Sequence, residues 1–154
     1  MTKRAHLDLA NYMPYLINRV GFALVASFSD NALVGEQLSI AMWRVLAALS
    51  NNGEQRQIDL VEMTSIDAST MSRLVTRMVR LGLVTRARSK TSNREVVVEL
   101  SAKGRAQVES LIPIAKSLED IASSGLSAKD QAVVKRALKK MYENLTNGRR
   151  KSHA

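Results

Sequence analysis

The feature that most constrains the fold is a change in the spacing of apolar residues along the chain. Over most of the sequence, apolar residues recur every three or four positions, as on one face of a helix. Between Leu83 and Leu100 this spacing ends, and the run Val96-Val97-Val98 favours β-structure. The sequence therefore predicts a mainly α fold with one small β-hairpin, whose strands cover about residues 83–88 and 95–100.

Capping residues predict where several helices begin and end. Ser39 precedes a helix that ends at Asn51-Asn52-Gly53, and Asp67 precedes a helix that Gly82 closes. Ser127, followed by Asp130, has the spacing of a capping box and opens a helix near the C-terminus. Further helices are expected over about residues 7–28, 57–63 and 102–122.

Two prolines and one polar stretch predict where helices bend or stop. Pro14 is expected in the first turns of its helix or at a bend, because its fixed φ suits a helix start. Pro113 should kink or break the helix that contains it. Residues 29–36 are expected to form a connection, since they contain Asp30, Asn31 and Gly35.

Positive charge is concentrated in one part of the sequence. The whole chain has a formal net charge of +9. Residues 1–66 hold five basic and six acidic residues, whereas residues 67–105 hold nine basic and three acidic ones. A focused excess of Lys and Arg favours a polyanionic partner.

The basic segment coincides with the pattern of a helix-turn-helix. A short helix, the turn Thr64-Ser65-Ile66 and a longer helix follow one another, and the longer helix has polar residues in its first turns. Its apolar side chains, Met71, Leu74, Val75 and Met78, should face inward. The predicted DNA contacts are on this helix Ser69, Thr70, Ser72, Arg73 and Arg77, and on the hairpin Arg88, Lys90, Asn93 and Arg94.

The same residues resemble the MarR family of bacterial regulators. The run from Asp67 to Val84 is similar to the recognition-helix signature of that family. The segment 38–46 resembles its preceding helix, and Arg86, Arg94 and the segment 100–104 resemble its wing and the helix that follows. The resemblance implies a winged helix-turn-helix that regulates transcription by binding double-stranded DNA at a pseudo-palindromic operator.

One position departs from the family pattern. The family usually has an Asp two residues before the wing Arg, and Ser92 occupies that place. In the family this Asp braces the wing, often through an Arg at the position of Arg86. Ser92 offers only a neutral hydrogen bond, so the hairpin is expected to be more mobile or Arg86 freer to meet phosphate. Arg86 itself is interpreted as a structural residue.

The terminal helices should form a homodimer. Their apolar stripes exceed what one winged module can cover, so association about a two-fold axis would bury them. The predicted boundaries are 1–36 for the N-terminal dimerisation helix, 37–101 for the DNA-binding domain, 102–147 for the C-terminal dimerisation helices and 148–154 for a frayed basic tail.

The resemblance also implies a small-molecule effector that releases the repressor from DNA. In the family, such pockets lie between the dimerisation helices and the winged module, and they often accept aromatic or phenolic anions. The expected effector is an aromatic or phenolic carboxylate or its acyl thioester. The residues proposed to line the pocket are Tyr12, Arg19, Phe22, Met42 and Trp43.

Several classes of function are disfavoured by residues that the sequence lacks. It contains no Cys and only two His, so thiol catalysis, disulfides and a zinc site have no usual ligands. No nucleophile elbow, phosphate-binding loop or paired-carboxylate motif is present. We therefore expect no enzyme activity, no cofactor, no metal and no membrane segment, and a cytoplasmic, nucleoid-associated bacterial protein.

Two alternatives remain open at this stage. The first is an architectural DNA-binding protein with little sequence preference and no effector, which would bind specific and random duplexes equally well. The second is a winged-helix module whose basic face meets an acidic protein, which would have no affinity for duplex DNA. Ser and Thr in the first turns of the recognition helix favour sequence reading over both alternatives.

Overall fold

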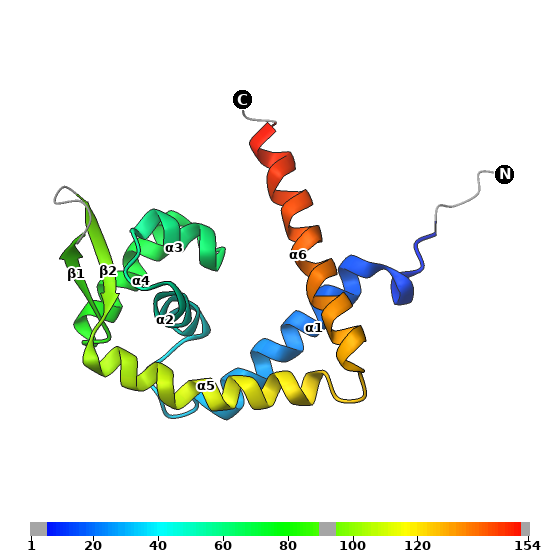
Figure 1. The fold of residues 1–154 in the computed structure, drawn as a ribbon, viewed down its shortest axis with the longest axis horizontal. Helices are drawn as coiled ribbons and strands as arrows, with labels where there is room; N and C mark the ends of the chain where they lie inside the picture. Colours follow the sequence, from blue (N-terminus) through cyan, green and yellow to red (C-terminus); the bar gives the residue numbers. More distant parts are fainter. Residues whose placement is uncertain (1–5, 90–94, 152–154) are drawn as a thin grey trace. The chain divides into compact units, whose positions relative to one another are not determined.

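The computed structural model describes residues 6–89 and 95–151 and confirms a mainly α fold with one β-hairpin (Figure 1). The chain divides into two compact units between Leu118 and Glu119. The elements are, in order, η1 (Leu9–Asn11), α1 (Met13–Phe28), η2 (Ser29–Leu33), α2 (Ile40–Asn52), α3 (Gln57–Thr64), α4 (Ala68–Arg80), β1 (Val84–Arg88), β2 (Val96–Leu100), α5 (Ala102–Ala122) and α6 (Ala128–Lys151).

The predicted helix caps are confirmed. The Ser39 side chain accepts a hydrogen bond from the Met42 amide at 3.3 Å, and Asp67 accepts one from the Thr70 amide at 2.9 Å. Ser127 and Asp130 form the expected capping pair, because the Asp130 amide donates to the Ser127 hydroxyl at 3.1 Å. Pro14 lies in the first turn of α1, where it removes no intrahelical hydrogen bond.

Three predicted boundaries are wrong. Residues 29–33 are not a connection, because the helix continues as the π-helical turn η2, whose Ala32 and Leu33 are buried with Phe28. Pro113 does not break α5, which runs unbroken from Ala102 to Ala122. The buried Leu111 and the half-buried Ile112 and Ile114 hold the helix on both sides of the proline.

The C-terminal boundary also differs from the prediction. Helix α6 continues to Lys151, so the backbone after residue 147 is helical where a frayed tail was expected. Good helix formers surround Gly148, and their propensity outweighs the cost of one glycine.

The core of the first unit lies between α2, α3, α4 and the hairpin. Its largest fully buried side chains include Met42, Leu46, Leu60, Met71 and Met78. A second cluster joins Phe28 to Leu111, and the Trp43 ring stacks on Phe28 with centroids 5.1 Å apart. These contacts fix the position of α4 relative to α2 and α3.

The hairpin pairs Val84 with Leu100 and Arg88 with Val96. A third segment joins it, because Gln55 and Val98 exchange backbone hydrogen bonds of 3.0 and 2.7 Å. The sequence did not predict this bridge, since a single paired residue leaves no alternating pattern. The bridge ties the hairpin to the residues just before α3.

Candidate nucleic-acid interface

Helix α4 separates apolar and cationic side chains onto opposite faces. Met71, Val75 and Met78 are fully buried, as predicted. The predicted contacts Ser69, Ser72, Arg73 and Arg77 are exposed, and Thr70 is half-buried. Arg80, which was not among the predicted contacts, is exposed on the same helix. The helix therefore offers polar groups near its N-terminus and three arginines to solvent.

The N-terminus of α4 is fixed by Asp67. Its carboxylate accepts hydrogen bonds from the Thr70 amide at 2.9 Å and from the Ser69 hydroxyl at 2.7 Å. Hydrogen bonds from the Thr70 side chain and amide, and then from Ser69, hold the pKa of the Asp67 carboxyl well below its usual range. The Ser69 hydroxyl hydrogen is thus used in the cap, and its oxygen remains an acceptor.

Asp67→Ala should lower the melting temperature at neutral pH, because it leaves the amides at the start of α4 without this acceptor. The pKa of Asp67 is lowered in the folded state, so the stabilisation is present above the ordinary aspartate pKa and is lost as pH falls through the folded pKa. Melting curves across this pH range should show the difference from the parent protein shrinking in acid. Asp67→Asn is the control, since an amide oxygen can still cap. A pH-independent difference for Asp67→Ala would contradict this role.

The C-terminal end of α4 is clamped by residues at the start of α5. Lys103 Nζ donates to the Leu81 carbonyl at 2.9 Å, and the Ser101 hydroxyl donates to the Gly82 carbonyl at 2.5 Å. Gly104 lets α5 approach closely, because a Cβ there would lie 1.9 Å from the Leu83 carbonyl oxygen. The segment 101–104 therefore fixes the recognition helix mechanically.

Two arginines connect the wing to the helices. Arg86 of β1 donates to the Thr76 hydroxyl of α4 at 3.1 Å, in agreement with its structural interpretation. Arg56 binds Asp59 through two hydrogen bonds of 2.8 Å and reaches Glu95 beside β2 at 3.5 Å. Sequence reasoning missed Arg56 and Lys103, because their partners lie in other elements; the cluster of polar residues around Arg56 was the only signal.

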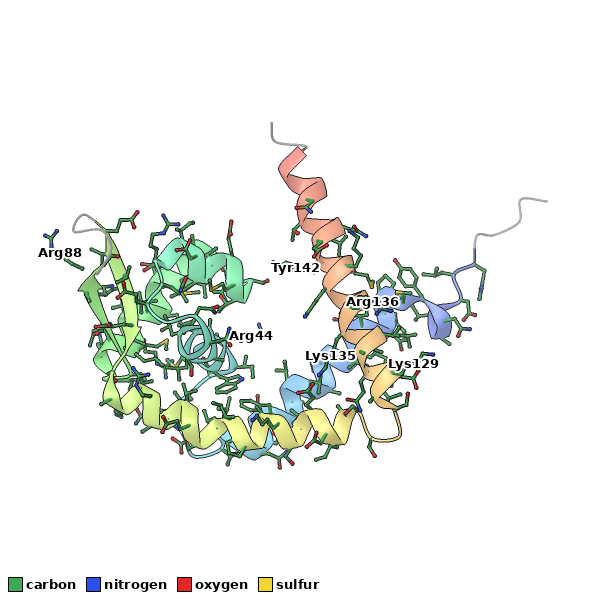
Figure 2. All side chains as sticks on the ribbon, viewed as in Figure 1. Arg44, Arg88, Lys129, Lys135, Arg136 and Tyr142 are labelled. Atoms are coloured by element: carbon green, nitrogen blue, oxygen red, sulfur yellow. The ribbon has the colours of Figure 1, made fainter. Side chains whose placement is uncertain are left out.

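The predicted wing contacts are only partly described. Arg88 is exposed at the outer end of β1 (Figure 2). Lys90, Asn93 and Arg94 lie outside the described residues, as does Ser92, so their contacts with DNA remain predictions.

The structure does not gather the five residues predicted for an effector pocket. Tyr12 and Phe22 are 41% and 76% exposed, whereas Met42 is completely buried in the core. Arg19 lies over the ring of Tyr15 on its own helix, 5.7 Å from the centroid. Trp43 alone borders a hollow, which lies between α2 and the end of α3.

Neither a metal centre nor a membrane span is found in the described part of the chain. Residues 6–89 and 95–151 hold no cluster of three or more His, Cys, Asp or Glu side chains placed to bind a metal. None of the described helices combines the length and the apolar character that crossing a membrane requires.

Comparisons with known proteins agree with this geometry. Residues 36–95 match the model of the MarR family. The chain is 26% identical over 140 residues to the HTH-type transcriptional repressor NicR of Pseudomonas putida, covering 91% of this chain and 88% of NicR. This relative is a regulator and not an enzyme.

Two solved structures share the fold. BpsR of Bordetella bronchiseptica, whose DNA binding is regulated by 6-hydroxynicotinic acid, is 26% identical with a TM-score of 0.78, covering 90% of this chain and 99% of BpsR. A MarR family regulator from Silicibacter pomeroyi is 28% identical with a TM-score of 0.79, covering 91% of this chain and 96% of that protein.

Proposed function

Since this chain belongs to the MarR family of transcription regulators, we propose that it is a sequence-specific repressor that binds a pseudo-palindromic operator as a homodimer. Two recognition helices α4 would enter successive major grooves about one helical turn apart, with the wings over the flanking minor grooves. Occupying a promoter would then block transcription.

The observation that carries this proposal is the exposed face of α4. Arg73 and Arg77 stand one helical turn apart, and neither takes part in an ion pair among the described residues. An arginine there can donate two hydrogen bonds to a guanine edge or neutralise a phosphate. Ser69 and Ser72, near the N-terminus, supply the shorter polar groups that reading base edges requires.

Exposed apolar side chains on the terminal helices support the dimer. On α1, Leu16, Val20 and Phe22 are 43%, 57% and 76% exposed. On α6, the exposed set is Val133, Val134, Leu138, Tyr142 and Leu145. A soluble monomer rarely leaves so many large apolar groups in water, so a second copy of the chain is the proposed cover.

Leu138→Glu should weaken dimerisation by about 100-fold or more, because a buried leucine is worth about 1.5–3 kcal/mol and the change occurs twice in a symmetric dimer. Sedimentation at a series of concentrations measures the effect. Lys139→Glu, an exposed neighbour on the same helix, is the control and should leave the dimer intact. Equal dimer constants for Leu138→Glu and the parent protein would remove α6 from the interface.

The effector proposal follows from the relatives. BpsR responds to 6-hydroxynicotinic acid, a hydroxylated aromatic carboxylate. We propose that an aromatic or phenolic carboxylate, or its acyl thioester, lowers the affinity of this repressor for its operator by binding better to the dimer that fits DNA poorly.

Selection of duplexes from a random pool tests the function. The full-length dimer should enrich a motif with two inverted half-sites whose centres lie about 10 base pairs apart. A pool that stays random while still being bound would indicate the architectural alternative. A protein that retains no duplex at moderate salt would indicate the protein-binding alternative.

A further inference from the structure

A hollow of about 540 Å³ lies between α2 and the C-terminal end of α3, away from the exposed face of α4. Its volume is within the usual range for small-molecule sites. The lining residues that matter for recognition are Trp43, Arg44, Ala47, Ala48, Asn51 and Met63.

Arg44 gives the hollow a positive charge. Its side chain is exposed and projects from α2 on the side away from the hairpin (Figure 2). Within residues 6–89 and 95–151, no ion pair involves Arg44. A guanidinium binds a carboxylate through two parallel hydrogen bonds, so this residue selects a planar anion.

The apolar part of the lining fits a flat ring. Trp43 is half-buried and held by its stacking on Phe28, so its indole offers a fixed surface. Ala47 and Ala48 leave room beside it, and Met63 supplies a thioether, which packs well on aromatic edges. Aromatic rings gain from offset stacking on an indole as well as from burial.

Asn51 adds a polar group. Its Nδ2 donates to Asn52 Oδ1 at 3.2 Å, and Asn52 Nδ2 donates to the Ala48 carbonyl at 2.8 Å. This chain of hydrogen bonds orients Asn51 so that its Oδ1, which accepts no hydrogen bond from the described residues, can accept one from a ring hydroxyl or ring N–H.

We propose that this hollow binds a planar aromatic acid, with Arg44 on the carboxylate and Trp43 against the ring. The regulatory consequence rests on the proposed function. Met63 and Thr64 are the last residues of α3, and Asp67, three positions further, caps α4. A ligand wedged between α2 and α3 therefore acts on the turn that positions the recognition helix of the same protomer.

Trp43 is the sole tryptophan of the chain, so its fluorescence reports binding directly. The full-length dimer is titrated with 6-hydroxynicotinate and with 4-hydroxybenzoate, and a saturable change is expected with at least one of them at millimolar concentration or below. Arg44→Gln should weaken that binding by at least about tenfold, and Arg44→Lys by less, because it keeps the charge without the planar fork. The neutral amides of both acids should not bind.

Arg19→Gln is the matched control, because it removes the other cation considered for this role and should leave the affinity unchanged. Unaltered binding by Arg44→Gln, or no saturable signal with either acid, would overturn the site. The fluorescence titration needs no DNA, so its result is separate from that of the duplex selection. A protein that binds acids through Arg44 but ignores duplex DNA would refute the repressor and keep the site.

Discussion

Arg73→Ala lowers the affinity of the dimer for its operator by about 2–6 kcal/mol, the largest functional effect that we expect, because a base-reading arginine is worth about 1–3 kcal/mol and occurs once in each half-site. The side chain is exposed on α4, one turn from Arg77 and opposite the buried Met71 and Met78. The loss should be accompanied by relaxed preference at one base pair of each half-site. Fluorescence anisotropy with the selected operator and its single-base variants measures both.

Arg105→Ala is the control for this prediction. Arg105 has the same charge and is exposed, but it lies on α5 and outside the helix-turn-helix. Its removal should change operator affinity only slightly, through the general field of the protein. An equal loss for both variants would mean that net charge, and not the placement of Arg73, determines binding. A loss for Arg73→Ala that is uniform over all sequences would make this residue a phosphate contact.

Gly104→Ala should destabilise the fold by about 3 kcal/mol or more, the largest stability effect that we expect, because the added Cβ would meet backbone that cannot rotate away. The Cβ would lie 1.9 Å from the Leu83 oxygen and 2.9 Å from the Leu83 carbonyl carbon. Separating α5 from the hairpin would also break the Lys103 and Ser101 hydrogen bonds to the end of α4. Denaturant unfolding measures the loss, and operator affinity should fall with it.

Gly21→Ala is the matched control, since this glycine is also helical and nothing lies within 4 Å of the added Cβ in the described structure. It should be neutral or should stabilise the protein by about 0.5–1 kcal/mol, because alanine is the better helix former. If the two variants have the same free energy of unfolding, the close approach at Gly104 carries no energetic weight.

Local signals explain what the sequence predicted well. Caps such as Ser39 and Asp67 act within three residues, and the inward stripe of α4 repeats at helical spacing, so both can be recognised in a short window. Contacts between distant elements leave no such trace. The Gln55–Val98 bridge, the Arg56–Glu95 ion pair and the Lys103 clamp depend on how α3, the wing and α5 pack.

The effector pocket shows the same limit. Met42 was placed there by prediction, yet it shares the buried face of α2 with Val45, Leu46 and Leu49. That spacing turns the positions between them outward, so Arg44 and not Met42 reaches the hollow. The resemblance to a family indicated that an effector exists, but only the rotation of α2 indicates which cation could meet it.

The most direct test of the central claim is a competition titration at physiological salt between the selected operator and a scrambled duplex of the same length and composition. If α4 reads base edges, the operator should bind at least about 1,000-fold more tightly. Equal affinities for the two duplexes would contradict sequence-specific recognition by this helix.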